Sequence, residues 1–269
     1  MEEKNYTLIT GASRGLGKAL AMECAKRGQN LILVASNSHL LSDTATQITD
    51  RYKVEARYFA IDLTTEHAAQ KVFEWCKSNQ YIVNVLINNA ALTGISVFDA
   101  SVPEYYEKLI DLNIKTLTIL CRLFIPEFRK LNNAYILNMG SMAAYFPFPY
   151  KSVYSASKAY LLNFSKSINS ELKGTGISVT VINPNGVYTS DEIFERIKAH
   201  GFMGRLLSVT PERLAEISID ALFKRKEVCV PKRANRILLG LNKLLPESYV
   251  NKLVKKEFRK ELMVINNKD

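Results

Sequence analysis

Apolar and polar residues follow two different patterns along this chain. Short, almost uninterrupted apolar runs recur at residues 6–10, 31–35, 56–61, 81–87, 134–141, 178–182 and 228–230. Between several of these runs the apolar side chains follow helical spacing instead, at residues 18–25, 38–55 and 103–131. Strands that are apolar throughout are typical of parallel sheets covered by helices on both faces. We therefore predict an α/β protein with a doubly wound parallel sheet.

Composition fits one such domain followed by a different kind of segment. With 269 residues, 47% of them hydrophobic, the chain can bury a large core as a single Rossmann-like domain. Residues 224–269 hold 13 Lys/Arg against 5 Asp/Glu, a local net charge of +8 out of +10 for the whole chain. Apolar residues recur among these charges. We predict a dinucleotide-binding and catalytic domain at 1–230 and a basic amphipathic C-terminal extension at 231–269.

The chain carries no sign of secretion, of a membrane span or of a metal centre. Its N-terminus has no apolar signal core, and no apolar run reaches the roughly 20 residues that span a bilayer. The four cysteines are scattered, as in free thiols of a reducing compartment, and the three histidines are dispersed. We expect a cytoplasmic protein without a metal. The basic extension could touch an anionic membrane or simply pack on the body, and without a recognition motif we expect no nucleic-acid partner.

A glycine-rich turn joins the first predicted strand to the first helix. Residues 11–17 read Gly-Ala-Ser-Arg-Gly-Leu-Gly. Such a turn at a helix N-terminus lets backbone amides approach a pyrophosphate, although it could also be a simple tight turn. The second strand ends in Ala35-Ser36-Asn37, without the acid that binds a ribose 2′-hydroxyl. Arg14 could pair with a 2′-phosphate there, or it could merely be solvated. Because the acid is absent and Arg14 is available for such a phosphate, we predict NADP(H) rather than NAD(H).

Four polar residues further along could form a proton-transfer site. Tyr154 and Lys158 are four positions apart, which places them on one face of a helix if this segment is helical. An ammonium beside a phenol lowers the phenol pKa, which suits a general acid/base. Ser141 ends a predicted strand 13 positions before Tyr154, and Asn113 lies 28 positions before Ser141 within an apolar helix face. Each residue alone has an ordinary interpretation: a solvated pair, a turn serine and a satisfied core asparagine.

Together these motifs resemble the short-chain dehydrogenase/reductase family over about residues 6–230. The turn from Thr10 to Gly17 matches the family's TGxxxGxG pattern, and the intervals match its Asn–Ser–Tyr–Lys tetrad. Ala91 departs from the last glycine of the family's NNAG motif, and Asn185 takes the place of a glycine in the loop after the sixth strand. Asparagine tolerates left-handed backbone better than other non-glycine residues, so we expect this loop to form.

The resemblance implies a role for each site residue. Tyr154 is the implied general acid/base, Ser141 orients the substrate carbonyl, Lys158 lowers the Tyr154 pKa and holds the nicotinamide ribose, and Asn113 positions a water. Without the resemblance, Asp62 would be read as a helix cap and Asn89 as part of a turn. The implied cofactor-binding residues are Gly11, Ser13, Arg14, Gly15, Leu16, Gly17, Ser36, Asp62, Leu63, Asn89, Ala90, Tyr154, Lys158, Pro184, Val187 and Thr189.

The substrate is indicated only by class. Apolar side chains in the expected lid, residues 190–210, and at 145–150 could wall an apolar pocket, or could be ordinary buried helix faces. We predict an NADP(H)-dependent oxidoreductase that interconverts a ketone and a secondary alcohol of a lipophilic compound, such as an acyl chain or sterol. By resemblance, helices 103–130 and 152–173 form a homodimer or homotetramer. The alternatives are a catalytically idle NADP-binding regulatory or scaffold protein, and a membrane-peripheral interaction protein built on the extension.

Overall fold

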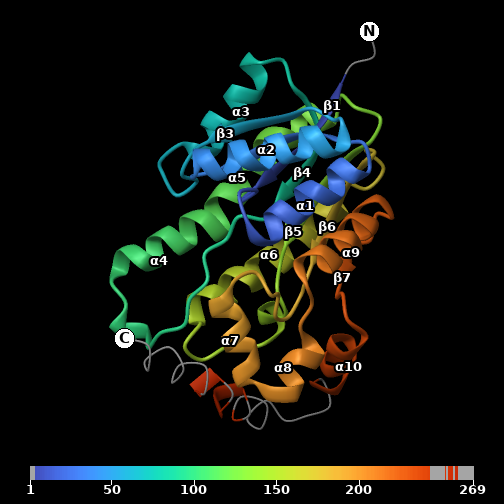
Figure 1. The fold of residues 1–269 in the computed structure, drawn as a ribbon. Coiled ribbons are helices and arrows are strands. Elements are labelled where there is room, and N and C mark those ends of the chain that lie inside the picture. The colour runs from blue at the N-terminus through green and yellow to red at the C-terminus, as the bar shows by residue number, and fades with distance from the viewer. Residues whose placement is uncertain (1–3, 243–251, 253, 257, 260–269) are drawn as a thin grey trace.

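Seven parallel strands form one sheet in the order β3-β2-β1-β4-β5-β6-β7 (Figure 1). The computed structural model describes residues 4–242, 252, 254–256 and 258–259 of the chain. The predicted doubly wound α/β fold is confirmed, and the strand bounds differ from the predicted ones by one or two residues. The strands are β1 (Asn5–Thr10), β2 (Asn30–Ala35), β3 (Ala56–Ala60), β4 (Ile82–Asn88), β5 (Ala134–Met139), β6 (Ile177–Ile182) and β7 (Val228–Cys229).

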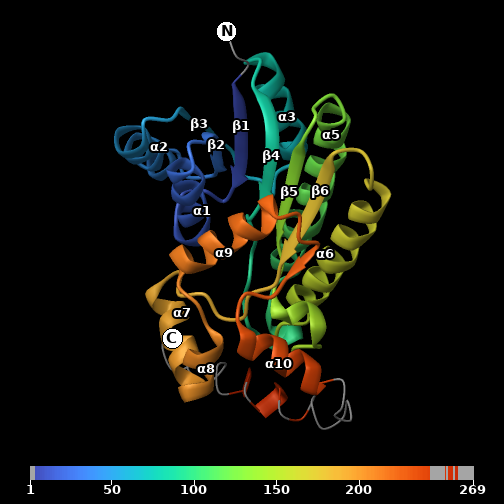
Figure 2. The ribbon, with the colours of Figure 1, turned by 90° about the vertical axis from the view of Figure 1, so that its right-hand side faces the viewer.

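Helices cover both faces of the sheet, as Figure 2 shows. On one face α1 (Gly15–Lys26), α2 (Ser38–Tyr52) and α9 (Pro211–Phe223) bury apolar side chains against the strands. On the other face α3 (Ala68–Ser78), α5 (Leu117–Phe128) and α6 (Ser152–Glu171) do the same. Removal of this apolar surface from water, at roughly 25 cal/mol per Å², is the main force that holds the layers together.

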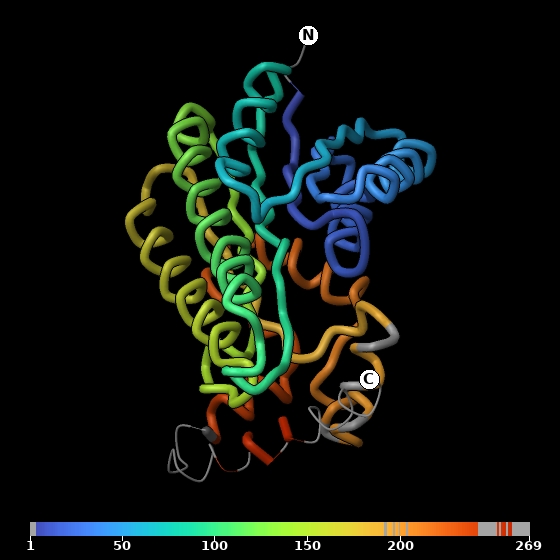
Figure 3. The backbone as a smooth tube through the Cα atoms, turned by 90° about the vertical axis from the view of Figure 1, so that its left-hand side faces the viewer, coloured from blue at the N-terminus to red at the C-terminus, as the bar shows by residue number. Residues whose placement is uncertain are grey.

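The long helix predicted at 103–131 is present but not regular. It consists of α4 (Pro103–Ile110), a π-helical segment (Asp111–Thr116) and α5, and it runs beside α6 (Figure 3). The π-helical segment contains the buried Asn113. π-helical segments are rare in proteins overall, and those that occur are often found at functional sites. Apolar periodicity predicts a helix here but does not reveal this local widening.

The strand order changes direction between β1 and β4. From β1 the chain proceeds outward to β2 and β3, then crosses back to β4 and continues through β5 and β6. At such a switch point the loops at the carboxyl ends diverge and leave a crevice, in which open α/β sheets bind their ligands. The glycine turn follows β1 and Asn89 follows β4, so the sheet topology brings both to this crevice.

Short helices lie beyond the carboxyl ends of the strands, opposite the N-terminus (Figures 1 and 2). They are α7 (Asp191–Ala199), α8 (Gly201–Leu207) and α10 (Arg233–Asn242), and short turns of 3-10 helix occur at Phe98–Ala100 and Met142–Tyr145. Lys232 Nζ donates to Leu206 O at 2.7 Å and Asn235 Nδ2 to Leu207 O at 3.1 Å, which docks α10 on α8.

Much of the predicted extension, 231–269, lies outside the described residues; its described part is residues 231–242, which include α10, together with residues 252, 254–256 and 258–259. Among the helices that the structure describes, none combines the length and apolar character needed to cross a bilayer.

Candidate active site

The glycine turn after β1 is tightly packed. Gly11 has a φ of +69°, and its N–H donates to Val34 O at 2.7 Å. A Cβ on Gly17 would come within 1.9 Å of Gly11 O, so glycine is required there. Arg14 is the N-cap of α1 and makes no side-chain capping bond. The first amides of α1 can therefore face an anion, and this turn fits a dinucleotide pyrophosphate.

Thr10 links the glycine turn to the residues after β4. Its Oγ1 accepts from the backbone N–H groups of Asn89 at 3.0 Å and Ala90 at 3.1 Å. Asn89 Nδ2 in turn donates to Thr10 O at 3.0 Å. These bonds bring the predicted cofactor residues 11–17 and 89–90 together across the switch point. The departure at Ala91 falls on an exposed residue just beyond them.

The predicted adenosine-side residues lie at the exposed rim of the crevice. Arg14 and Ser36 are both exposed. Asp62 Oδ1 accepts from Thr64 N–H at 2.9 Å and from Thr64 Oγ1 at 2.8 Å, which closes a local turn. The N-cap of α3 is His67, so the interpretation of Asp62 as the cap of that helix is wrong. Leu63 is buried, and its carbonyl accepts from Thr116 Oγ1 at 2.7 Å. An adenine contact at Asp62 stays a prediction.

Ser141 is fixed by a residue that the sequence interpretation missed. Ser141 Oγ accepts from Ala143 N–H at 3.1 Å, and Ser141 N–H donates to Asn183 Oδ1 at 3.1 Å. Asn183 has no exposed surface, and its Nδ2 donates to Tyr145 Oη at 3.1 Å. The signal in the sequence was Asn183 directly after the sixth strand, beside Pro184, where a buried polar side chain would need partners.

Tyr154 and Lys158 both project from α6 toward Ser141 and β5. Tyr154 shares a hydrogen bond with Ser141; burial raises the pKa of the Tyr154 phenol, and this bond opposes the rise. Lys158 is buried, and its Nζ donates to Met139 O at 2.8 Å. Burial lowers the pKa of Lys158 from 10.5 to about 8.

The pKa of Tyr154 differs in direction from the one that we expected beside Lys158. We expected Lys158 to lower the pKa of Tyr154, but the Tyr154 pKa is raised. Lys158 Nζ lies 5.6 Å from the centroid of the Tyr154 ring and is bonded to the β5 backbone. Burial of the phenol raises the Tyr154 pKa against the effect of the hydrogen bond with Ser141, and burial also lowers the pKa of Lys158.

Asn113 connects the loop after β4 to α6. Its Oδ1 accepts from Leu92 N–H at 2.8 Å, and its Nδ2 donates to Leu92 O at 2.9 Å and to Ser157 Oγ at 3.3 Å. The side chain is thus satisfied in the core, in keeping with the ordinary interpretation. Positioning of a water by Asn113 stays a prediction.

The loop after β6 closes the site from the other side. Pro184 O accepts from Met142 N–H at 2.8 Å, and a Cβ on Gly15 would lie 3.3 Å from Thr189 Cβ. Val187 pairs with Val209 in an isolated parallel bridge. Asn185 is not among the residues of positive φ, so the loop forms without the left-handed residue that we expected there.

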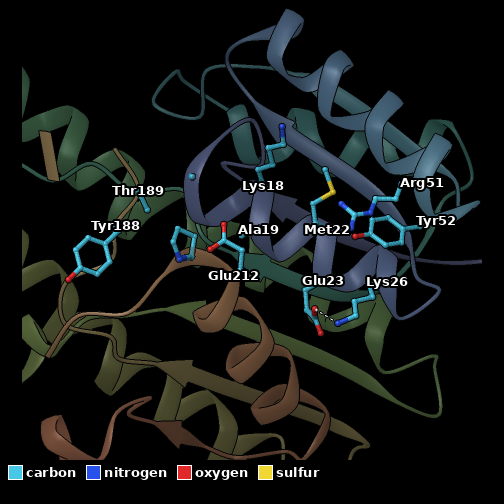
Figure 4. A pocket seen from close by; sticks show the side chains of 12 residues that line it. Lys18, Ala19, Met22, Glu23, Lys26, Arg51, Tyr52, Tyr188, Thr189 and Glu212 are labelled. Atoms are coloured by element: carbon cyan, nitrogen blue, oxygen red, sulfur yellow. Dashed lines mark ion pairs between the residues drawn. The ribbon is translucent and has the colours of Figure 1, made fainter. Parts of the chain in front are cut away.

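Two cavities flank this region, and they differ greatly in size. A groove of about 580 Å³ runs along the outer face of α1, past Lys18, Met22 and Glu23, to Thr189 (Figure 4). It contains none of the tetrad residues. A cleft of only about 10 Å³ lies at Tyr154, between Tyr150 and the residues of α4. Of the tetrad, Tyr154 lines the narrow cleft, and none of the four residues lines the groove.

The expected lid is largely open to solvent. Phe194 is 51% exposed and Phe202 is 71% exposed, whereas Ile197 is 6% exposed. The apolar lid residues were expected either to wall a substrate pocket or to be ordinary buried helix faces. Ile197 is buried, as the second interpretation expects. The exposed phenylalanines remain available to an apolar ligand.

The fold and the glycine turn define a dinucleotide-binding α/β protein of the dehydrogenase class. A family model described as "short chain dehydrogenase" matches residues 5–197, and the chain belongs to this family. The family predicted from the sequence motifs is thus confirmed.

Several characterised proteins are similar to this chain. A very-long-chain 3-oxoacyl-CoA reductase of Anas platyrhynchos is 33% identical over 195 residues, which cover 68% of this chain but 60% of that protein. The human 17-beta-hydroxysteroid dehydrogenase type 3 is 30% identical over 243 residues, covering 90% of this chain and 75% of that protein. A short-chain dehydrogenase from Sphingobium yanoikuyae in complex with NADPH superposes with a TM-score of 0.76 at 31% identity, covering 89% of this chain and 94% of that one.

Proposed function

We propose that the chain is an NADP(H)-dependent oxidoreductase that interconverts a ketone and a secondary alcohol. The observation that carries the proposal is the meeting of Ser141, Tyr154 and Lys158 at the carboxyl end of β5. There Tyr154 shares a hydrogen bond with Ser141, and the buried Lys158 has its pKa lowered to about 8. Perturbed titratable groups in a cleft are typical of proton-transfer sites.

The chain's own residues handle the proton and the carbonyl. The nicotinamide, when bound, supplies or accepts the hydride. Tyr154 gives its phenolic proton to the carbonyl oxygen during reduction and takes one back during oxidation. Ser141 donates to the same oxygen and stabilises the negative charge that develops on it. Lys158 holds the nicotinamide ribose hydroxyls and supports the proton exchange of Tyr154, while Asn113 positions a water that links Lys158 to solvent.

We propose NADP(H) as the cofactor, held by the predicted residues of the glycine turn, of the strand ends and of the loop at 184–189. The support is Arg14, which is exposed at the N-cap of α1, together with the lack of an acid after β2. The NADPH complex of the similar Sphingobium protein agrees with this choice.

A lipophilic substrate fits the same site. The exposed Phe194, whose ring lies 5.8 Å from that of Tyr188 in the loop after β6, and the exposed Phe202 on α8 offer apolar surface, and each would gain by covering an apolar ligand. Two similar proteins are named for a very-long-chain acyl thioester and for a hydroxysteroid. We propose an acyl chain, a sterol or a related lipid.

The test is reduction of apolar ketones with NADPH by the full chain and by Tyr154→Phe. The variant should lose about 100-fold or more in kcat and still bind NADPH, because general acid catalysis contributes about that much. Tyr160→Phe is the matched control, since Tyr160 lies on the same helix and is exposed. If the unmodified chain binds NADPH but reduces no ketone in a broad panel, the idle regulatory or scaffold protein becomes the better account.

We also propose the division into a catalytic domain at 1–230 and an extension at 231–269. On α10 the exposed Ile237 and Leu241 lie one turn apart on the face that also carries Arg233, which favours peripheral contact with an anionic membrane. In a flotation assay with phosphatidylserine vesicles, the full chain should move with the vesicles, and the Ile237→Glu variant should stay behind in the dense fraction.

The four cysteines are free thiols, in keeping with a cytoplasmic protein.

We also propose a homodimer or homotetramer whose subunits meet through α4, α5 and α6. Light scattering, which measures the mass of the particle in solution, tests this proposal.

A further inference from the structure

One aromatic side chain of the extension lies against the loop that joins the catalytic residues. The ring of Phe258 is 4.4 Å, centroid to centroid, from the ring of Phe148. Lys151 Nζ lies 4.8 Å from the Phe258 centroid, at a distance typical of a cation–π contact. Phe258 is half-buried. Residues more than a hundred positions apart are thus in contact, and the extension reaches the catalytic side of the molecule.

The neighbours of Phe258 are close to Ser141 and Tyr154 along the chain. Phe148 stacks on Phe146, at 6.1 Å, directly after the short 3-10 turn that Ser141 caps. Lys151 is the N-cap of α6, and it lines the narrow cleft together with Tyr154. The segment beneath Phe258 is therefore the loop that leads from one reacting hydroxyl to the other.

A second flank reaches Phe258 from the lid. His200, at the junction of α7 and α8, lies 6.1 Å from Phe258, centroid to centroid, in an edge-on arrangement. Phe258 consequently bridges the loop at 146–151 and the α7–α8 junction.

The size of the cleft makes this contact relevant to the substrate. The space at Tyr154, about 10 Å³, is less than a single small molecule needs, so most of a long apolar substrate must lie outside it. Lys151 lines this cleft, and on Lys151 lies the ring of Phe258, which packs against Phe148. Packing of an apolar chain on these rings would remove both from water.

We propose that Phe258 is a specificity-determining residue, which forms with Phe148 the outer apolar wall of the substrate site and contacts the part of a lipophilic substrate remote from its carbonyl. This inference rests on the proposed function and deepens it. The extension then contributes to substrate choice, and the ring of Phe258 favours long apolar ketones over short ones.

The experiment compares KM and kcat for methyl ketones of increasing length, from butanone to dodecanone, in the full chain and in Phe258→Ala. Loss of one apolar contact in a pocket typically changes discrimination by about tenfold. We expect the KM for dodecanone to rise by about tenfold, while kcat and the KM for butanone stay unchanged. Phe258→Leu should recover most of the preference. Lys256→Ala is the matched control, because Lys256 is exposed on the same segment.

The outcomes separate this inference from the proposed function. An unchanged dodecanone-to-butanone ratio in Phe258→Ala, with Tyr154→Phe still inactive, overturns the role of Phe258 and leaves the oxidoreductase intact. If the unmodified chain reduces no ketone, the proposed function fails. Calorimetric titration with dodecanone then still decides the inference: weaker binding to Phe258→Ala than to Lys256→Ala supports the wall, and equal binding overturns it.

Discussion

Asn183 Oδ1 accepts a hydrogen bond from the backbone N–H of Ser141 at 3.1 Å, across 42 positions of sequence. The bond joins the carboxyl ends of β5 and β6, which are neighbours in the sheet. A Cβ on Gly140 would come within 2.1 Å of the same oxygen, so the glycine before Ser141 makes room for it. The buried amide thus fixes the backbone at Ser141, while the Ala143 N–H of the following 3-10 turn holds the Ser141 hydroxyl.

Replacement of Asn183 by leucine should weaken both stability and activity. The Ser141 N–H and the Tyr145 hydroxyl would each lose a buried partner, at a cost of about 1–3 kcal/mol per group in the free energy of unfolding. We expect kcat to fall by about tenfold or more, because Ser141 loses its fixed position. Urea unfolding and steady-state kinetics measure the two effects. Asn163→Ala, at an exposed site on α6, is the control, and equal behaviour of the two variants would contradict the role of Asn183.

Lys158 should make stability depend on pH in a defined direction. Its pKa falls from 10.5 to about 8 on folding, so between these values the unfolded chain binds more protons than the native one. Stability conferred at this site therefore rises with pH across that window, by up to about 3 kcal/mol, and is least below pH 8.

Lys158→Met removes this titration. The unfolding free energy of the unmodified chain minus that of the variant should increase as the pH rises from 8 to 10.5. Burial also raises the pKa of the Cys24 thiol from 9.0 to about 12, so its contribution to stability falls as the pH rises above 9, but the comparison cancels this effect because both proteins contain Cys24. A difference that does not change with pH would show that Lys158 keeps an ordinary pKa.

The sequence predicts the sheet well because its strands are buried on both faces. Continuous apolar runs are compatible with few structures other than buried strands, which explains the correct prediction of β1, β2, β4, β5 and β6. The glycines of the turn could be recognised from the sequence because the structure requires them: Gly11 has a positive φ, and a Cβ on Gly17 would collide with Gly11 O. The proximity of Ser141, Tyr154 and Lys158 was predicted only through the resemblance, because their intervals match the family's tetrad.

Other features depend on contacts between distant segments, which local patterns do not encode. The π-helical segment around Asn113 arises where its amide meets the backbone of Leu92, and the amide of Asn183 finds Ser141 only after β5 and β6 have paired. The same holds for Phe258, whose neighbours lie on the loop at 146–151. The pKa of Tyr154 was predicted with the wrong sign because burial of the phenol cannot be read from its distance to Lys158 in sequence.

Gly17→Ala should abolish cofactor binding. The added methyl group would meet Gly11 O at 1.9 Å and the Asn89 amide at 2.7 Å, so the turn after β1 must move. Calorimetric titration with NADPH should show at least about a 100-fold weaker affinity, since the backbone amides lose their alignment with the pyrophosphate. Gly240→Ala, a helical glycine with open space around its Cα, should bind NADPH normally. Normal binding by Gly17→Ala would exclude the glycine turn as the phosphate site.

Arg14 and Ser36 should together set the choice of cofactor. If the Arg14 guanidinium pairs with the 2′-phosphate, Arg14→Ala loses a charge-assisted hydrogen bond of about 1.5–3 kcal/mol and about tenfold to 100-fold in kcat/KM with NADPH, but little with NADH. Ser36→Asp adds a carboxylate at the end of β2, which repels the phosphate and can accept from a free ribose 2′-hydroxyl, so its preference should reverse toward NADH. Arg122→Ala, exposed on α5, is the control for lost positive charge. Equal losses with both cofactors in Arg14→Ala would mean that Arg14 serves the shared pyrophosphate and that NADP(H) preference has another origin.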